Sequence, residues 1–178
     1  MKSITSRDNP LYKRIKALAG STAQQRRSGH ALLEGLHLAS AYLDSAGQPE
    51  TCVVTEGALT HAEAREIVAR IEEKRVRAAG CAFRPALQRR ARRGHAAVEK
   101  IDAELPGRVA ETCVILDGIQ DAGNVGSILR SVTAAGVTRV FCAPGTAYAW
   151  SSKVLRSGMG AHFLLEIFED VESADLIV

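Results

Sequence analysis

Asn124, Gly126 and Arg130 lie at a junction where the apolar run CVILDGI is followed by a helical pattern. An asparagine at such a position is a good candidate to cap the helix, because its side-chain oxygen accepts hydrogen bonds from free backbone N–H groups. A guanidinium carries a permanent charge and a planar fork of donors, which suits contacts with oxyanions. These residue types predict a helix start that presents one arginine to a ligand.

The helical pattern over residues 124–136 predicts where that arginine points. Its apolar side chains recur at the spacing of one helix face, and they are Val125, Ile128, Leu129 and Val132. With about 100° per residue, Arg130 lies about 150° from the centre of that face. Gly126 and Ser127 lie on the side of Arg130 and leave a shallow floor that suits close approach by a ligand or a partner chain. From the spacing alone, an ordinary exposed arginine after a capped helix stays open as the alternative.

Strand and helix patterns alternate around this junction. Strands are expected at 112–119 and 137–145, a second helix at 151–161, and an extended segment at 163–171. Such alternation predicts an α/β fold with a parallel sheet and right-handed crossovers. Ligands of such sheets bind beyond the carboxyl ends of strands, so the loop 117–124 is the expected place of chemistry.

The first half of the chain is expected to contain a small α/β domain. Helical patterns cover residues 6–20, 31–46 and 61–74, and a short strand pattern with its exit turn covers 51–59. Residues 75–100 are rich in arginine and poor in large apolar residues, which predicts a linker or an exposed basic segment.

The two halves differ in charge. Residues 1–100 contain 18 basic and 10 acidic residues, a net charge of +8, whereas residues 101–178 contain 5 and 10, a net charge of −5. This asymmetry favours contact of the first half with a polyanion, although a solvated basic helix would also fit. Pro106 and Gly107 precede the next strand, so domains are expected at 1–100 and 110–178.

Several other functions lack their sequence signals. Dinucleotide binding needs a further glycine and an acidic residue after the second strand, which instead ends in CAP. A phosphate-binding P-loop needs a lysine where Gly126 stands, and the G-x-S-x-G motif of serine hydrolases does not occur. His162, after GMGA, is expected to end a helix rather than to act as a base.

The cysteines and the hydropathy exclude further classes. Cys52, Cys81, Cys113 and Cys142 are widely spaced without a C-x-x-C pair, so reduced and buried thiols are expected, with no metal site. No stretch is apolar over the length that a bilayer span needs, and the N-terminus has no signal-peptide core. A soluble, cytoplasmic protein is expected.

Two segments resemble a known family. DGIQDAGNVGSILRSVTAAG resembles motif 1 of the SpoU (TrmH-like) RNA ribose 2′-O-methyltransferases of the SPOUT superfamily, through Asn124, Gly126 and Arg130. SSKVLRSGMGAHFLLEIF resembles motif 2 of that family, with the expected order Lys153, Arg156, Ser157, Met159, Gly160 and Ala161. SRDNPLYKRIKAL and GHALLEGLHLASAYL resemble the family's N-terminal substrate-binding domain, so the resemblance covers most of the chain.

The resemblance implies a small N-terminal α/β substrate-binding domain followed by a partial knotted α/β methyltransferase domain with a parallel sheet. It implies a homodimer that uses S-adenosylmethionine to methylate a ribose 2′-hydroxyl in rRNA or tRNA. Asn124 and Arg130 are then the catalytic residues. Because a guanidinium with a pKa above about 12 is a poor base, we expect Arg130 to bind a phosphate beside the ribose and to stabilise the developing alkoxide.

The same resemblance assigns further site residues. RNA contacts are expected at six cations, Arg7, Lys13, Arg14, Lys16, Lys153 and Arg156. Structural roles in motif 2 are expected for Ser157, Gly158 and Gly160. Neither a metal nor a membrane is implied.

The sequence departs from the family pattern in two places. The third motif, which supplies much of the cofactor pocket, is expected beyond Val178, so a truncated chain is expected and no cofactor-binding residue is assigned. Residues 77–99 lack the strand and short apolar helix that similar proteins carry, and a local reading-frame shift would explain this. The alternative function is a non-catalytic RNA-binding module with an incomplete methyltransferase domain.

Overall fold

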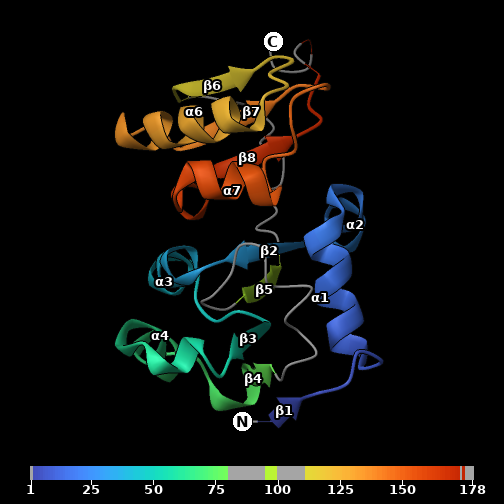
Figure 1. Ribbon diagram of the computed structural model, residues 1–178. Coiled ribbons are helices and arrows are strands. Elements are labelled where there is room, and N and C mark those ends of the chain that lie inside the picture. The colour runs from blue at the N-terminus through green and yellow to red at the C-terminus, as the bar shows by residue number, and fades with distance from the viewer. Residues whose placement is uncertain (1, 80–94, 100–110, 173, 175–178) are drawn as a thin grey trace. The chain divides into compact units, whose positions relative to one another are not determined.

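The computed structural model describes residues 2–79, 95–99, 111–172 and 174. The chain divides into two compact units, Met1–Lys100 and Ile101–Val178. Each unit is built around its own sheet (Figure 1).

A five-stranded mixed sheet forms the centre of unit 1, in the order β1-β4-β3-β5-β2. Strands β1, β4 and β3 are parallel, whereas β5 runs antiparallel to β3 and to β2. The bounds are Lys2–Ile4 for β1, His30–Glu34 for β2, Thr51–Thr55 for β3, Val76–Ala79 for β4 and His95–Glu99 for β5.

Helices cover both sides of this sheet, with α1 and α2 on one side and α3 and α4 on the other (Figure 1). Consecutive residues of β3 enter different cores: Val53 packs with Ile15 and Leu18 of α1, and Val54 packs with Leu36 and Ile67. This follows from the alternation of side chains along a strand. The bounds are Pro10–Gly20 for α1, Thr22–Ser28 for α2, Leu36–Ser45 for α3 and Ala62–Ala69 for α4, with 3-10 turns η1 at Ala58–Thr60 and η2 at Glu73–Arg75.

The helix expected in residues 6–20 is confirmed as α1. Its N-cap is Asn9, whose Oδ1 atom accepts a hydrogen bond from the backbone N–H of Leu11 at 2.9 Å, and Pro10 opens the helix. Proline is favoured there because its missing N–H would have no partner in the first turn.

The helix expected over residues 31–46 is wrong in its first part, because residues 30–34 form β2. Ala31, Leu32 and Leu33 are all fully buried, so this strand has no alternation of apolar and polar residues to distinguish it from a helix. Its pairing with β5, about 65 residues further along the chain, makes it a strand. Gly35, with φ of 95°, separates β2 from α3 in a conformation that glycine tolerates.

Two strands lie where a linker or exposed basic segment was expected. β4 and β5 fall within residues 75–100, and both pair with β3 in the middle of the sheet. Small residues such as Ala78, Ala96 and Ala97 occupy these strands, which explains why few large apolar side chains mark them. The arginine-rich part of this segment, residues 84–93, lies outside the described residues.

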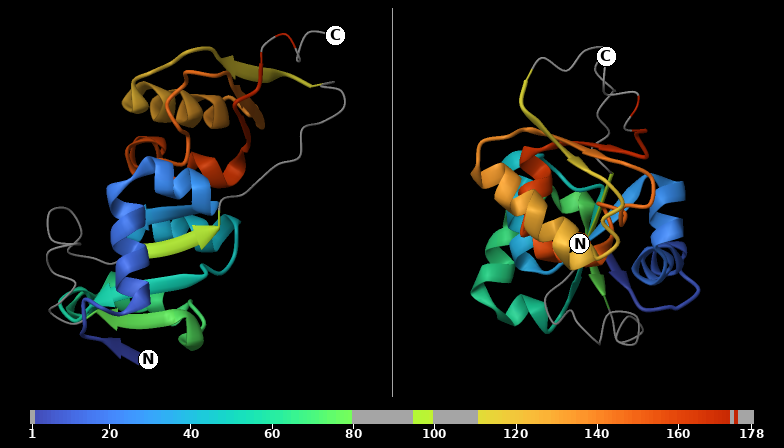
Figure 2. Two further views of the ribbon diagram at one scale, coloured as in Figure 1. Left: turned by 90° about the vertical axis from the view of Figure 1, so that its right-hand side faces the viewer. Right: turned by 90° about the horizontal axis from the view of Figure 1, so that it is seen from above.

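Unit 2 contains a parallel three-stranded sheet in the order β6-β7-β8. Figures 1 and 2 show α6 and α7 on the same side of it, as two right-handed crossovers in one direction require. The bounds are Cys113–Leu116 for β6, Ala122–Ala134 for α6, Arg139–Cys142 for β7, Ser152–Gly158 for α7 and Glu166–Glu169 for β8, with a 3-10 turn η4 at Ala161–Leu164.

The core of unit 2 is aromatic, and of its two cysteines Cys142 is buried, whereas Cys113, expected to be buried, is half-buried. The rings of Phe141 and Phe168 stack at 4.7 Å on neighbouring strands. Burial raises the pKa of the Cys142 thiol, and of Cys52 in unit 1, to about 12. Cys52, Cys113 and Cys142 are free, whereas Cys81 lies outside the described residues.

None of the described helices combines the length and apolar character that a membrane span requires.

Candidate active site

Asp121, rather than Asn124, is the N-cap of α6. Its Oδ1 atom accepts a hydrogen bond from the backbone N–H of Asn124 at 2.9 Å, and its Oδ2 atom lies 3.2 Å from the Nζ atom of Lys153 on α7. The hydrogen bond from the Asn124 backbone contributes most to holding the pKa of the Asp121 carboxyl below its usual value, and the contact with Lys153 lowers it further. The expectation that Asn124 caps the helix is wrong, because the helix already begins at Ala122 and aspartate caps as well as asparagine.

Asn124 and Arg130 carry side-chain donors that no other described residue satisfies. Both side chains are exposed on α6, and neither takes part in a hydrogen bond or ion pair within the described part of the chain. The apolar face of α6 that the sequence predicted lies on the other side of the helix, where Val125 and Leu129 are fully buried. Arg139 differs, because its Nε atom lies 2.6 Å from Glu166 Oε2. The guanidinium of Arg130 is therefore available to an external anion.

Gly126 is buried against α7 and does not form an open floor beneath Arg130. A Cβ atom on Gly126 would lie 1.9 Å from Ser157 Oγ, 2.7 Å from Val154 O and 2.8 Å from Gly158 N. The expected close approach does occur, but the neighbour is another helix of the same unit. The exposed residue beside it is Ser127, whose hydroxyl donates to the carbonyl of Asn124 at 2.9 Å.

The motif 2 residues on α7 form the other half of this contact. The Oγ atom of Ser157 lies 3.2 Å from Ala122 O on α6 and 3.0 Å from Lys153 O on its own helix. Gly158 is buried and leaves room for an imidazole, because a Cβ atom there would lie 2.7 Å from His162 Cε1. Gly160 has φ of 92° and begins η4 in the left-handed region that favours glycine.

His162 is fully buried behind this contact, which its position after GMGA did not indicate. Its Nε2 atom lies 2.8 Å from Ala149 O, and its ring centroid lies 5.5 Å from that of Trp150. Burial lowers the pKa of His162 to about 4, so the ring is neutral at physiological pH. A neutral imidazole with its proton on Nε2 donates to Ala149 O and fills the space that Gly158 leaves.

A comparison with protein families matches the segment that contains both α6 and α7 and the sheet of unit 2. Residues 111–177 match a family model described as the SpoU rRNA Methylase family. This part of the chain is therefore similar to the SpoU methylase family. We call unit 2 the SpoU domain, and its α/β fold class, expected from the sequence, is confirmed.

Relatives share different parts of the chain. The rRNA methyltransferase 3A, mitochondrial, of Danio rerio is 49% identical over 63 residues, which are 35% of this chain and 14% of that protein. The 23S rRNA (guanosine(2553)-2′-O)-methyltransferase RlmP of Bacillus subtilis is 33% identical over 79 residues, 37% of this chain and 32% of its own. A Synechocystis protein named as an uncharacterised tRNA/rRNA methyltransferase is 30% identical over 169 residues, 92% of this chain and 60% of its own. The part of the chain that matches the Danio rerio protein covers only 14% of the length of that protein.

Solved structures share the fold over both units. The SpoU methyltransferase AviRb from Streptomyces viridochromogenes, in complex with AdoMet, has a TM-score of 0.78 and 25% identity over 93% of this chain and 64% of its own. An rRNA methyltransferase from Sinorhizobium meliloti has a TM-score of 0.77 and 24% identity over 98% of this chain and 66% of its own.

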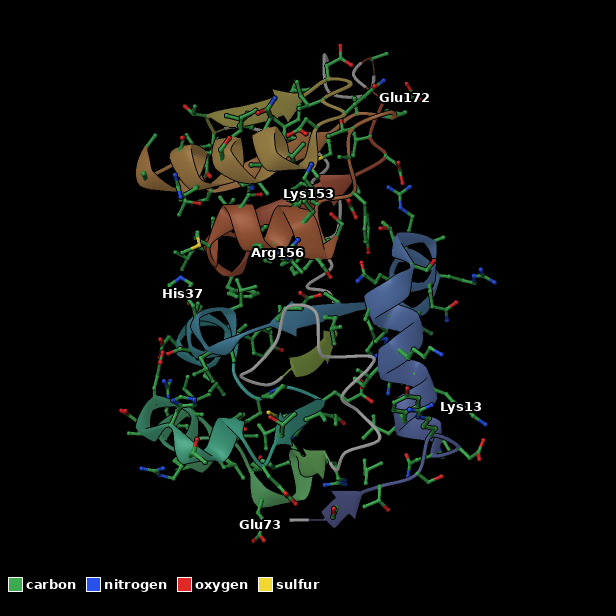
Figure 3. All side chains as sticks on the ribbon, in the orientation of Figure 1. Lys13, His37, Glu73, Lys153, Arg156 and Glu172 are labelled. Atoms are coloured by element: carbon green, nitrogen blue, oxygen red, sulfur yellow. The ribbon has the colours of Figure 1, made fainter. Side chains whose placement is uncertain are left out.

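The predicted RNA contacts fall into two groups. Lys153 and Arg156 lie on α7 of the SpoU domain (Figure 3), where Lys153 is exposed and already paired with Asp121. Of the cations on or before α1, Arg7 and Lys16 are exposed without a partner among the described residues. Lys13 lies 3.3 Å from Asp8 Oδ1, and Arg14 is held by Glu50. The structure therefore brings Asn124, Arg130, Lys153 and Arg156 onto two packed helices, while the other four cations belong to unit 1.

We expect the SpoU domain to lose stability as pH falls through the range set by His162. The unfolded chain binds a proton near pH 6.5, whereas the folded ring binds one only near pH 4. Between these values the free energy of unfolding should fall by about 1.4 kcal/mol per pH unit, roughly 3 kcal/mol in total. Urea unfolding followed by the fluorescence of Trp150, the single tryptophan, measures this slope.

The matched variant is His162→Gln, whose amide can still donate to Ala149 O but does not titrate. Its unfolding free energy should show a shallower decrease over the same pH range, because only the remaining groups contribute. Equal slopes in the two proteins would show that His162 is not the buried neutral group that the structure describes.

Proposed function

We propose that this protein transfers the methyl group of S-adenosylmethionine to a ribose 2′-hydroxyl of an rRNA or a tRNA. The observation that carries the proposal is the guanidinium of Arg130, which is exposed on α6 and has no partner among the described residues. Asn124 is exposed on the same helix, roughly 9 Å nearer its start. Support comes from the SpoU family match, from the rRNA 2′-O-methyltransferase name of the Bacillus relative, and from the AdoMet complex of the Streptomyces structure.

The chemistry is a displacement in which the ribose oxygen forms a bond to the methyl carbon while the carbon–sulfur bond breaks. The hydroxyl proton leaves to water or to a phosphate oxygen, and negative charge builds on the ribose oxygen. Arg130 donates two hydrogen bonds to the neighbouring phosphate and faces the developing alkoxide, which its fixed charge stabilises. Asn124 orients the ribose through its free amide.

S-adenosylmethionine supplies the electrophilic methyl group when it is bound. The free donors of Asn124 and Arg130 suit the phosphate and hydroxyl of a ribose phosphate better than an adenosyl group. No cofactor-binding residue is therefore assigned to the described part of the chain. Positioning of the acceptor hydroxyl can alone lower the barrier by roughly 7 to 11 kcal/mol.

The proposal includes partners and setting. Unit 1, with its net positive charge, is the RNA-binding domain, and residues 1–100 and 110–178 are the two functional domains. The homodimer implied by the resemblance stays a prediction, as does the cytoplasmic location expected from the hydropathy and the N-terminal residues. Whether rRNA or tRNA is the substrate depends on the RNA shape that unit 1 accepts.

The test is methyl transfer from radiolabelled S-adenosylmethionine to purified rRNA and tRNA, followed by nuclease digestion and nucleoside analysis. We expect label in a nucleoside that carries a 2′-O-methyl group, and only with one class of RNA. Label in a base would keep a methyltransferase but contradict the ribose hydroxyl as the acceptor.

The second candidate is an RNA-binding module without catalysis, which the charge of unit 1 also favours. Calorimetric titration with S-adenosylmethionine separates the two functions. Saturable binding together with transfer supports the enzyme. RNA binding without any cofactor binding would establish the module and contradict the proposed activity.

A further inference from the structure

The two sides of the unit 1 sheet carry opposite charge. Residues 6–29, which include α1 and α2, contain six basic residues and one acidic residue, a net charge of +5. Residues 36–75, which include α3 and α4, contain four basic and seven acidic residues. One of the acidic residues, Glu50, contacts Arg14 of α1, so the other residues of this segment have a net charge of −2, and the α1–α2 side stays at +4 when Glu50 is counted there. Because these helices cover opposite sides of the sheet (Figure 1), a polyanion is attracted to one side and repelled from the other.

The described arginines of the α3–α4 side are engaged within the protein. Arg65 donates to the carbonyls of Leu59 and Thr60, both at 3.0 Å. Arg70 forms an ion pair with Asp44. The third arginine is Arg75, whose Nε atom lies 3.1 Å from Glu72 Oε2. A phosphate that approached this side would have to displace these partners.

Arg14 on α1 is also engaged, by a carboxylate that joins three segments. Its two terminal nitrogens donate to the two oxygens of Glu50, both at 2.6 Å, and Glu50 Oε2 lies 2.9 Å from His30 Nε2 on β2. The hydrogen bond from Arg14 holds the pKa of the Glu50 carboxyl below its usual value, and His30 adds a smaller effect in the same direction. Arg14 therefore has a structural partner, which removes it from the expected phosphate contacts.

Three other cations of the α1–α2 side have no such partner. Arg7, Lys16 and Arg27 are exposed, and none forms a hydrogen bond or ion pair within the described residues. On α1, Tyr12, Ile15 and Leu18 are buried, whereas Lys16 is exposed to solvent, as is Lys13, which Figure 3 labels. Arg27 lies in the last turn of α2. With about 1.5 Å per residue, α1 alone spans roughly 16 Å, enough to meet several phosphates.

We propose that RNA lies on the α1–α2 face of unit 1, with phosphates contacted by Arg7, Lys16 and Arg27, and that Arg14 only holds α1 in place. The identity of the polyanion as RNA rests on the proposed function. Unpaired cations bind phosphate without first breaking an ion pair, and they release counterions from the RNA. Arg27 is thereby added to the expected contacts and Arg14 is withdrawn from them.

The test compares two double variants that each remove two positive charges. Lys16→Gln with Arg27→Gln changes the α1–α2 face, and Arg70→Gln with Arg75→Gln changes the opposite side. Binding of a fluorescently labelled hairpin RNA is measured by anisotropy, without cofactor, at KCl concentrations from about 50 to 200 mM.

We expect the first double variant to bind roughly tenfold more weakly, and the slope of log affinity against log salt to become shallower by about 0.7 to 0.9 for each lost contact. The control should bind within about twofold of the wild type with an unchanged slope, because its cations are already neutralised locally. Equal losses in both variants, or no RNA binding by the unchanged protein, would overturn the proposal.

Two further measurements complete the test. Arg14→Gln should lower the urea midpoint of unit 1 and leave the salt slope unchanged, whereas a shallower slope would place Arg14 among the contacts. A polyglutamate peptide that displaced the RNA at equal charge concentration would assign the face to an acidic protein and overturn the RNA proposal. The RNA-binding assay contains no cofactor. A failure of methyl transfer in the separate activity assay would therefore contradict the proposed function and leave the RNA-binding results unchanged.

Discussion

Replacement of Gly126 by alanine is expected to destabilise the SpoU domain by about 2 kcal/mol or more. The added methyl group would meet Ser157 Oγ at 1.9 Å, and it would also meet two backbone atoms, Val154 O and Gly158 N, at 2.7 and 2.8 Å. A backbone atom cannot turn aside as a flexible side chain can, so α6 and α7 must separate. Alanine favours the helix over glycine by about 1 kcal/mol, which offsets only part of this cost.

Urea unfolding followed by Trp150 fluorescence measures this loss, and two variants serve as controls. Gly123→Ala places its methyl group on the same helix, where the nearest contact is the Asp121 carboxylate at 2.9 Å and no backbone atom outside the helix is close. A shift of this side chain would weaken the N-cap by about 1 kcal/mol, which the helix preference of alanine offsets, so a smaller change is expected. Combining Gly126→Ala with Ser157→Gly should recover part of the stability, because only the backbone contacts then remain. A Gly126→Ala protein as stable as the wild type would contradict the α6–α7 contact itself.

Replacement of Arg130 by lysine is expected to reduce kcat/KM for RNA methylation by about a hundredfold or more, if the proposed function is right. The charge is retained, but a lysine ammonium cannot offer the two parallel donors that hold a phosphate and face an alkoxide together. The urea midpoint should stay that of the wild type, because Arg130 has no partner among the described residues that the change would remove.

Arg139→Lys is the matched control for this change. Arg139 pairs with Glu166 across β7 and β8, so its replacement should lower stability slightly and leave the rate of methyl transfer unchanged. Near-normal turnover of the Arg130→Lys protein would show that a point charge is sufficient and that the geometric role is wrong. A large loss in both variants would point to a general effect of charge or folding.

Local patterns account for the elements that were predicted correctly. The spacing of Tyr12, Ile15 and Leu18 and the Asn9-Pro10 start depend on residues within a few turns of each other, and α1 follows from them. The same holds for α6 and for the β/α alternation of the SpoU domain, whose strands and helices each have a period of their own. The exposure of Arg130 also follows from this period, because Val125 and Leu129 define the buried face.

Predictions failed where a distant segment decides the structure. Ala31, Leu32 and Leu33 fit a helix by their sequence, and only pairing with β5 makes them a strand. The cap of α6 was predicted at Asn124 from its residue type alone, whereas the structure begins the helix at Ala122 and makes Asp121 the cap. His162 gave no signal of burial, since one histidine after two glycines has no period to interpret.

The sequence by itself determined the two charged halves, the motif residues of the SpoU domain, and most helices and strands, because composition and periodicity reside in neighbouring residues. Only the tertiary structure decided that Gly126 is covered by Ser157 and that Glu50 neutralises Arg14. It also decided that Arg7, Lys16 and Arg27 have no partner among the described residues. Each of these facts is a contact, or the lack of one, between side chains that the fold places together or keeps apart. Short-range patterns carry no information about such distances.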